Sequence, residues 1–96
     1  MHETLNRAED EVVQICQDLI RIDTSNFGDG SGPGEAEAAA YVVASLREVG
    51  LQPQTFESDP GRVSVVVRIP GADPSRGALC IHGHLDVVPA NAADWS

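Results

Sequence analysis

The sequence predicts an α/β fold in which two helices precede about three strands, forming the N-terminal part of a mixed sheet layered with helices. In the first part of the chain, apolar residues recur at the spacing of an amphipathic helix. The later part instead holds short runs rich in valine and other apolar residues, which are typical of strands. Segments rich in Gly and Pro separate these regions, so the expected order is helix, helix, strand, strand, strand.

The first helix is expected over residues 4–21. Its apolar stripe recurs at helical spacing and comprises Leu5, Ala8, Val12, Ile15, Cys16 and Leu19. The polar run 23–26 is expected to end the helix, because short polar side chains bond to nearby backbone and favour turns. A Gly-rich connection, residues 27–34, follows.

The second helix is expected over residues 35–49. The face that we expect to be buried comprises Ala36, Ala39, Ala40, Val43 and Leu46. Glu35 and Glu37 favour the positive N-terminal end of the helix dipole, and Arg47 favours the negative C-terminal end. Gly50 stands where a left-handed residue commonly closes a helix.

Three strands are expected after the second helix. Residues 52–57 form a weak candidate, because Pro53 confines such a strand to an edge or to its own start. Residues 62–69 form a strong candidate with four valines, Val63, Val65, Val66 and Val67. Residues 78–82 are nearly all apolar, as in a central strand covered on both faces.

Composition limits the class of protein and its partners. A chain of 96 residues suits one small domain or part of a larger one, and its low aromatic content of 4% favours a part. The net charge of −9, from 15 acidic and 6 basic residues, argues against nucleic acid or an anionic membrane as a partner. The N-terminus carries no leader pattern, so the expectation is a soluble cytoplasmic protein.

The two cysteines are expected to be structural. Cys16 falls on the apolar stripe of the first helix and Cys80 lies inside the last apolar strand. Both are therefore expected to be small buried hydrophobic residues. No C-x-x-C spacing indicates zinc or redox chemistry.

The pattern His82-Gly83-His84-Leu85-Asp86 directly follows the last apolar run. In an extended H-x-D segment both side chains start on the same side of the backbone. His84 can therefore be a metal ligand while Asp86 holds its ring, and His82 permits an H-x-H-x-D interpretation with three groups. A structural interpretation stays open, in which His82 bonds backbone and Asp86 caps a turn. The position at the C-terminal end of an apolar strand favours the metal site, because ligands bind there in open α/β sheets.

Residues 79–90, followed by Trp95, resemble the first metal-binding signature of the M20 metallopeptidase family. Residues 19–26 and 35–51 are also similar to the N-terminal region of that family. The resemblance implies a zinc-peptidase-like catalytic domain with two zinc ions, or cobalt or manganese. It implies that His84 ligates one metal and that Asp86 orients it as a catalytic residue, while His82 matches no family ligand.

The resemblance also implies that residues 1–96 are the N-terminal portion of the catalytic domain. The other metal ligands, the general base and the lid domain that forms homodimers would then lie beyond Ser96. We expect the complete enzyme to hydrolyse an amide or peptide bond in a small amino-acid-derived substrate, and the 96-residue chain alone to be inactive.

Two other classes of protein stay open. H-x-H-x-D also resembles the metallo-β-lactamase motif, although Val87 stands where that motif has another histidine, and H-x-H occurs on the first strand of amidohydrolase barrels. Alternatively, the chain is a non-catalytic truncated protein or an interaction module.

Overall fold

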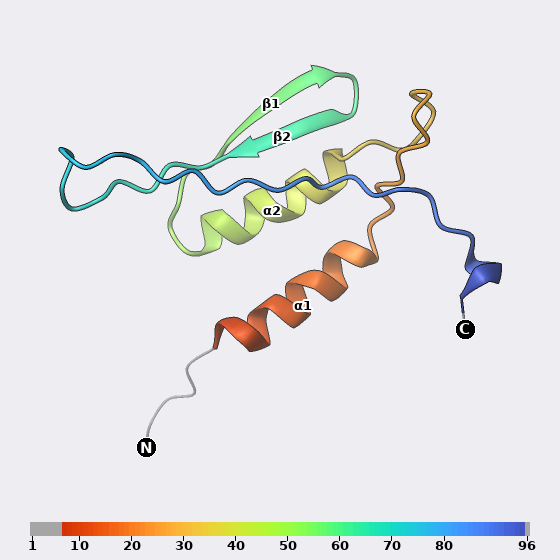
Figure 1. Ribbon diagram of the computed structural model, residues 1–96, viewed down its shortest axis with the longest axis horizontal. Helices are drawn as coiled ribbons and strands as arrows, with labels where there is room; N and C mark the ends of the chain where they lie inside the picture. Colours follow the sequence, from red (N-terminus) through yellow and green to blue (C-terminus); the bar gives the residue numbers. More distant parts are fainter. Residues whose placement is uncertain (1–6, 96) are drawn as a thin grey trace.

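The structure is a computed structural model that describes residues 7–95. Its elements are α1 (Ala8–Ile20), α2 (Ala36–Glu48), β1 (Gln54–Asp59), β2 (Arg62–Val66) and a short 3₁₀ helix, η1 (Ala92–Asp94). Two helices followed by a sheet confirm the predicted α/β class. Figure 1 shows α2 between the strand pair and α1. The expected start of the first helix at residues 4–6, Leu5 included, lies outside the described residues.

Helix α2 forms almost where the sequence predicts it and ends as predicted. Gly50 has a φ of +88°, the left-handed conformation expected after the helix. The Gly50 N–H donates to the carbonyl of Arg47 (2.9 Å), and the Leu51 N–H donates to the carbonyl of Leu46 (3.0 Å). These two bonds form a Schellman motif, which satisfies carbonyl groups that the end of a helix otherwise leaves free.

Strands β1 and β2 form an antiparallel hairpin, in which Thr55 lies opposite Val65. The turn is Pro60-Gly61, and Gly61 has a φ of +81°, which suits the third position of a type II turn. The second strand ends at Val66 rather than at the predicted residue 69. Its partner β1 begins opposite Val66, at Gln54. Pro53 just before it has no N–H to extend the ladder.

The connection before α2 packs against the hairpin turn. The N–H of Glu35 donates to the carbonyl of Gly61 at 2.8 Å. Gly34 has a φ of +79°, and a Cβ at this position would collide with the same Gly61 carbonyl. A residue without a side chain is therefore required for the backbones to approach this closely.

The core lies where the start of α2 meets β2, and it is small. Ala38 and Ala39 are each 1% exposed, and they are the only buried hydrophobic residues in the range 7–95. The predicted burial of Ala39 is confirmed, whereas Ala36 and Ala40 are exposed. The prediction for these two was wrong because the hairpin covers the neighbouring face of the helix, which carries Ala38.

Helix α1 is linked to α2 by a polar contact, while its apolar stripe is largely exposed. The Tyr41 hydroxyl donates to Asp18 Oδ2 at 2.6 Å, and this bond is the largest cause of the lowered pKa of the Asp18 carboxyl. No residue of α1 is buried. Cys16 is exposed, contrary to the prediction, because no layer covers this face in the described part of the chain. Neither α1 nor α2 has the length and apolar content needed to cross a bilayer.

The predicted third strand at residues 78–82 does not form. This segment has no ladder partner among residues 7–95, and Leu79 and Ile81 are 85% and 88% exposed. Cys80, which was expected to be buried there, is exposed as well. The strand is absent because an apolar run becomes a strand only when another strand takes up its backbone hydrogen bonds. The two-stranded sheet of the described residues consists of β1 and β2 alone.

Gly34→Ala is expected to destabilise the natural protein, meaning the protein as its source cell makes it, by about 1–3 kcal/mol, because the new methyl group meets the Gly61 carbonyl in a left-handed backbone conformation. Urea unfolding of the natural protein measures the change. Gly71→Ala is the matched control, because Gly71 has open space around its Cα. Equal free energies of unfolding for the two variants would contradict the packing described here.

The isolated 96-residue chain is expected to self-associate or to be partly unfolded. Its segment at residues 78–82 exposes apolar side chains together with unpaired backbone groups, and these features favour pairing with other chains. Light scattering and thermal unfolding followed by circular dichroism measure both properties. A monodisperse monomer that melts cooperatively would show that this expectation is wrong.

Candidate functional site

Two segments far apart in the sequence lie side by side at the site. Ser25 and Val87 form an isolated parallel bridge. The Asn26 N–H donates to the carbonyl of Val87 (2.7 Å), and the Val87 N–H donates to the carbonyl of Thr24 (3.1 Å). The Thr24 hydroxyl adds a bond of 2.9 Å to the carbonyl of Leu85, and this threonine is only 4% exposed. The bridge holds the segment containing the H-x-D pattern against residues 24–26, which follow α1.

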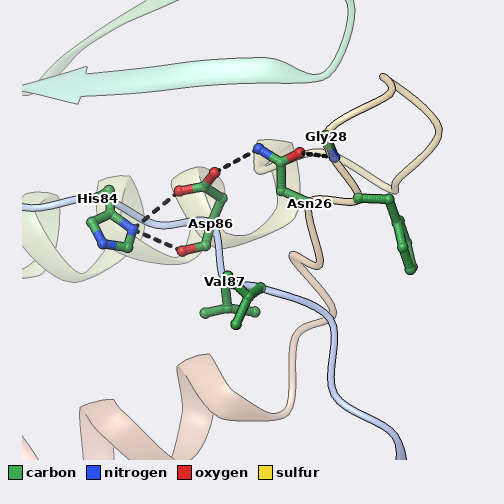
Figure 2. A pocket seen from close by; sticks show the side chains of 7 residues that line it. Asn26, Gly28, His84, Asp86 and Val87 are labelled. Atoms are coloured by element: carbon green, nitrogen blue, oxygen red, sulfur yellow. Dashed lines mark hydrogen bonds and ion pairs between the residues drawn. The ribbon is translucent and has the colours of Figure 1, made fainter.

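The geometry of His84 and Asp86 selects one tautomer of the neutral imidazole ring. Nδ1 of His84 lies 3.0 Å from Asp86 Oδ1 and 2.8 Å from the Asp86 backbone oxygen. A carboxylate and a carbonyl can only accept hydrogen bonds, so Nδ1 must carry the proton. The neutral ring then has its lone pair on Nε2, which points away from Asp86 in Figure 2.

The Asp86 carboxylate divides its two oxygens between different partners. Oδ1 accepts from His84, while Oδ2 accepts from the Asn26 side-chain amide at 2.8 Å and lies 3.8 Å from Arg62 Nη2. The Asn26 bond is the main reason that the pKa of Asp86 is lowered, and His84 and Arg62 act in the same direction. The carboxylate is therefore ionised at neutral pH and able to hold the ring of His84 in one orientation.

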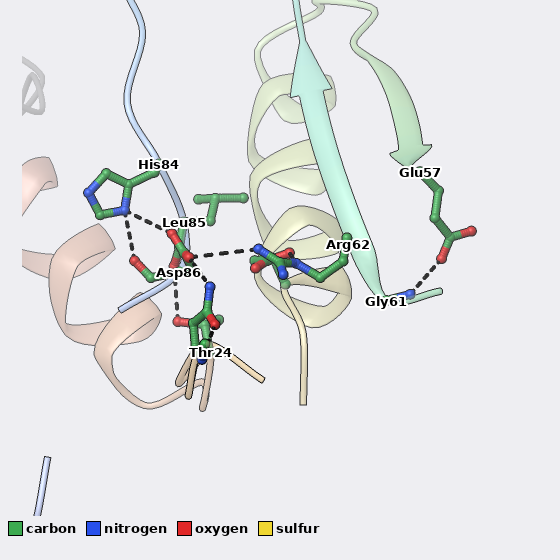
Figure 3. Close-up of polar contacts among 10 residues, drawn as sticks. Thr24, Glu57, Gly61, Arg62, His84, Leu85 and Asp86 are labelled. Carbon is green, nitrogen blue, oxygen red and sulfur yellow. Dashed lines mark hydrogen bonds and ion pairs between the residues drawn. The ribbon is translucent and has the colours of Figure 1, made fainter. Parts of the chain in front are cut away.

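Arg62 connects the site to the fold. Its Nε donates to Glu35 Oε2 at 2.9 Å, and the Glu35 side chain is only 9% exposed. The bond and the negative charge of Glu35 raise the pKa of the Arg62 guanidinium. Figure 3 shows Arg62 reaching from β2 toward Asp86. The first residue of β2 and the residue before α2 thus fix a positive charge beside the Asp86 carboxylate.

A wide, shallow pocket of about 310 Å³ lies beside His84 and Asp86. Its lining comes from both segments of the bridge and comprises Asn26, Phe27, Gly28, His84, Asp86, Val87 and Val88. Phe27 and Val88 are 55% and 82% exposed, so the apolar part of the lining is accessible to a small molecule.

Nε2 of His84 fits one ligand position of a divalent metal. The His84 side chain is 80% exposed, and its neutral Nε2 is the type of donor that zinc and related metals accept. Residues 7–95 contain no group of three His, Cys, Asp or Glu side chains arranged to hold an ion. His82 is exposed and forms no hydrogen bond or ion pair with His84 or Asp86, so these three groups do not converge on one point.

Sequence reasoning placed His84 and Asp86 together but missed the residues that hold them. Thr24 and Asn26 were assigned to a turn, and Glu35 was assigned only to the helix dipole. The available signal was the spacing of two between Thr24 and Asn26, which suits an extended segment. Nothing local indicated that this segment pairs with residues about 60 positions later, as the Asn26–Asp86 bond does.

Comparison with known proteins relates the chain to aminoacylases. It is 34% identical to aminoacylase-1 of Homo sapiens over 64 residues, which are 67% of this chain and 16% of that protein. It is 33% identical to aminoacylase-1 of Mus musculus over 88 residues, which are 92% of this chain and 21% of that protein. The chain therefore spans about a fifth or less of the length of these relatives. No protein-family model and no solved structure matches it.

Thr24→Val is expected to destabilise the natural protein by about 0.5–1.5 kcal/mol, because it removes the bond to Leu85 while keeping the side-chain volume. Thr55→Val, at an exposed position of β1, is the matched control and is expected to change little. Urea unfolding of the two variants measures the difference. If Thr24→Val is no less stable than the control, the hydroxyl does not contribute to the bridge.

Proposed function

We propose that this chain is the N-terminal portion of an M20-type metal-dependent hydrolase that cleaves the amide bond of an N-acyl amino acid or a similar small substrate. The observation that carries the proposal is the His84–Asp86 pair, in which the proton on Nδ1 leaves Nε2 free to bind a metal. The similarity to aminoacylase-1 supports the hydrolase class and the kind of substrate.

The residues of this chain would act by holding and orienting groups. His84 would supply one metal ligand through Nε2. Asp86, accepting from Nδ1, would fix the rotation of the ring and increase the basicity of the ligating nitrogen. A bound divalent metal in such an enzyme lowers the pKa of a water molecule and polarises the carbonyl to be cleaved. The pocket beside His84, with Phe27 and Val88 in its lining, offers an apolar surface for part of the substrate.

The other components of the reaction would lie outside residues 1–96. A second metal, the general base and the remaining ligands would come from another part of the complete enzyme. Zinc is the metal that we propose, with cobalt and manganese as alternatives. Dimerisation through a separate lid domain stays a prediction.

His84→Ala in the natural protein is expected to abolish amide hydrolysis and to remove one bound metal, because water does not reproduce the position of the imidazole. Hydrolysis of N-acetyl amino acids and metal content by mass spectrometry measure these effects. Asp86→Ala is expected to weaken metal binding or activity by about 10- to 100-fold, since it removes the group that orients the ligand. Cys80→Ser serves as the control, with metal content and activity unchanged.

His82→Ala separates the M20-type site from the other metal-hydrolase motifs. In the proposed site His82 is not a ligand, so this variant is expected to keep its metal and its activity. Loss of a metal from this variant would favour an H-x-H-x-D site instead. A natural protein without bound metal and without amidase activity would contradict the enzyme proposal altogether and favour the interaction module.

A further inference from the structure

Asn26 makes three hydrogen bonds in different directions at the centre of the site. Its backbone N–H donates to the carbonyl of Val87 at 2.7 Å. Its side-chain oxygen accepts from the Gly28 N–H at 2.9 Å, and its side-chain nitrogen donates to Asp86 Oδ2 at 2.8 Å. Figure 2 shows the side-chain amide between Gly28 and Asp86. With the oxygen held by Gly28, the amide must present its nitrogen to Asp86.

The Asp86 carboxylate has a restricted choice of orientations as a result. A carboxylate on the surface would rotate about its side-chain torsions and exchange its two oxygens. Here the Asn26 nitrogen binds Oδ2 and leaves Oδ1 directed at His84 Nδ1. Arg62 contributes less to this restriction, because it lies 3.8 Å from Oδ2 and its closer bond, of 2.9 Å, goes to Glu35.

We propose that Asn26 is a positioning residue, which directs the Asp86 carboxylate at His84 and so prepares Nε2 of His84 to bind a metal. This inference rests on the proposed function, but the orientation of Asp86 can be tested without a metal. Asn26 acts through Asp86 and His84 and does not itself bind the metal. The donor on its side chain, rather than its volume, carries the effect.

Two substitutions separate the donor from the rest of the side chain. Asn26→Asp keeps an oxygen that can accept from Gly28 and keeps the volume, but it replaces the donor with a second acceptor facing Asp86. Asn26→Ala removes both side-chain bonds, the one with Gly28 and the one with Asp86. Gln14→Ala is the matched control, because Gln14 also donates a side-chain amide bond of 2.8 Å to a carboxylate, that of Asp18 on α1.

The experiment measures zinc affinity by chelator competition and the structure of the metal-free natural protein by crystallography. Both Asn26 variants are expected to bind zinc about 10- to 100-fold more weakly, as is typical when a group behind a metal ligand is lost. In their crystal structures Asp86 is expected to leave His84 or to occupy two conformers. Gln14→Ala is expected to match the native protein within twofold.

Asn26 also lines the pocket, so a direct contact with the substrate is the main rival explanation. The rival predicts that KM rises while zinc affinity and the Asp86–His84 contact stay unchanged, and this result would overturn the proposal. Native zinc affinity in Asn26→Asp would overturn it too, because that variant keeps the volume and the Gly28 bond. If the native protein binds no zinc, the proposed function fails, and the crystal structures alone decide whether Asn26 positions Asp86.

Discussion

The short parallel bridge between residues 24–26 and 85–87 is the constraint on which the rest of the site depends. The backbone bonds of Thr24 and Asn26 with Val87 join segments far apart in the chain, and the Thr24 hydroxyl adds a bond to Leu85, 61 residues away. Loop-closure entropy grows only slowly with loop length, so a few well-placed bonds can close such a loop. Thr24 is one of the few buried residues among those described. Within residues 7–95, the bridge and the contacts of Asp86 with Asn26 and Arg62 supply the hydrogen bonds and ion pairs that join residues 78–91 to the rest of the fold.

The bridge matters for chemistry because it brings the neutral Asn26 amide to the Asp86 carboxylate, beside which the charged Arg62 also lies. Asn26 comes with the first segment of the bridge, and Asp86 comes with the second. Arg62 arrives separately, through the hairpin and its ion pair with Glu35. In a chain with a net charge of −9, a carboxylate that keeps amide and guanidinium partners stays ionised and oriented. The fold thus supports the ring of His84 through a chain of polar contacts rather than through a large apolar core.

The elements that could be predicted from the sequence are those with local causes. Helix α2 has a periodic apolar face and Gly50 as its end. The two strands were expected at residues 52–57 and 62–69, whereas their pairing across the Pro60-Gly61 turn was not predicted. The proximity of His84 and Asp86 follows from their spacing of two, and the structure places them within 3.0 Å.

Long-range partners decided the features that sequence analysis missed. The strand expected at 78–82 needs a neighbour that the described residues do not supply, and Cys80 is exposed for the same reason. The face of α1 carrying Cys16 likewise lacks a covering layer. Asn26 and Arg62 became visible as site residues only when the bridge and the hairpin were in place, because no local pattern links either residue to Asp86.

Amide hydrogen exchange at Asn26 and Val87 tests the central role of the bridge most directly. Both N–H groups donate across it, at 2.7 Å to Val87 and at 3.1 Å to Thr24. In the natural protein we expect both amides to exchange far more slowly than those of the Gly-rich loop at residues 28–32, whose backbone lies on the surface. Exchange of both amides as fast as in that loop would mean that the bridge does not persist, and the account of the site would be wrong.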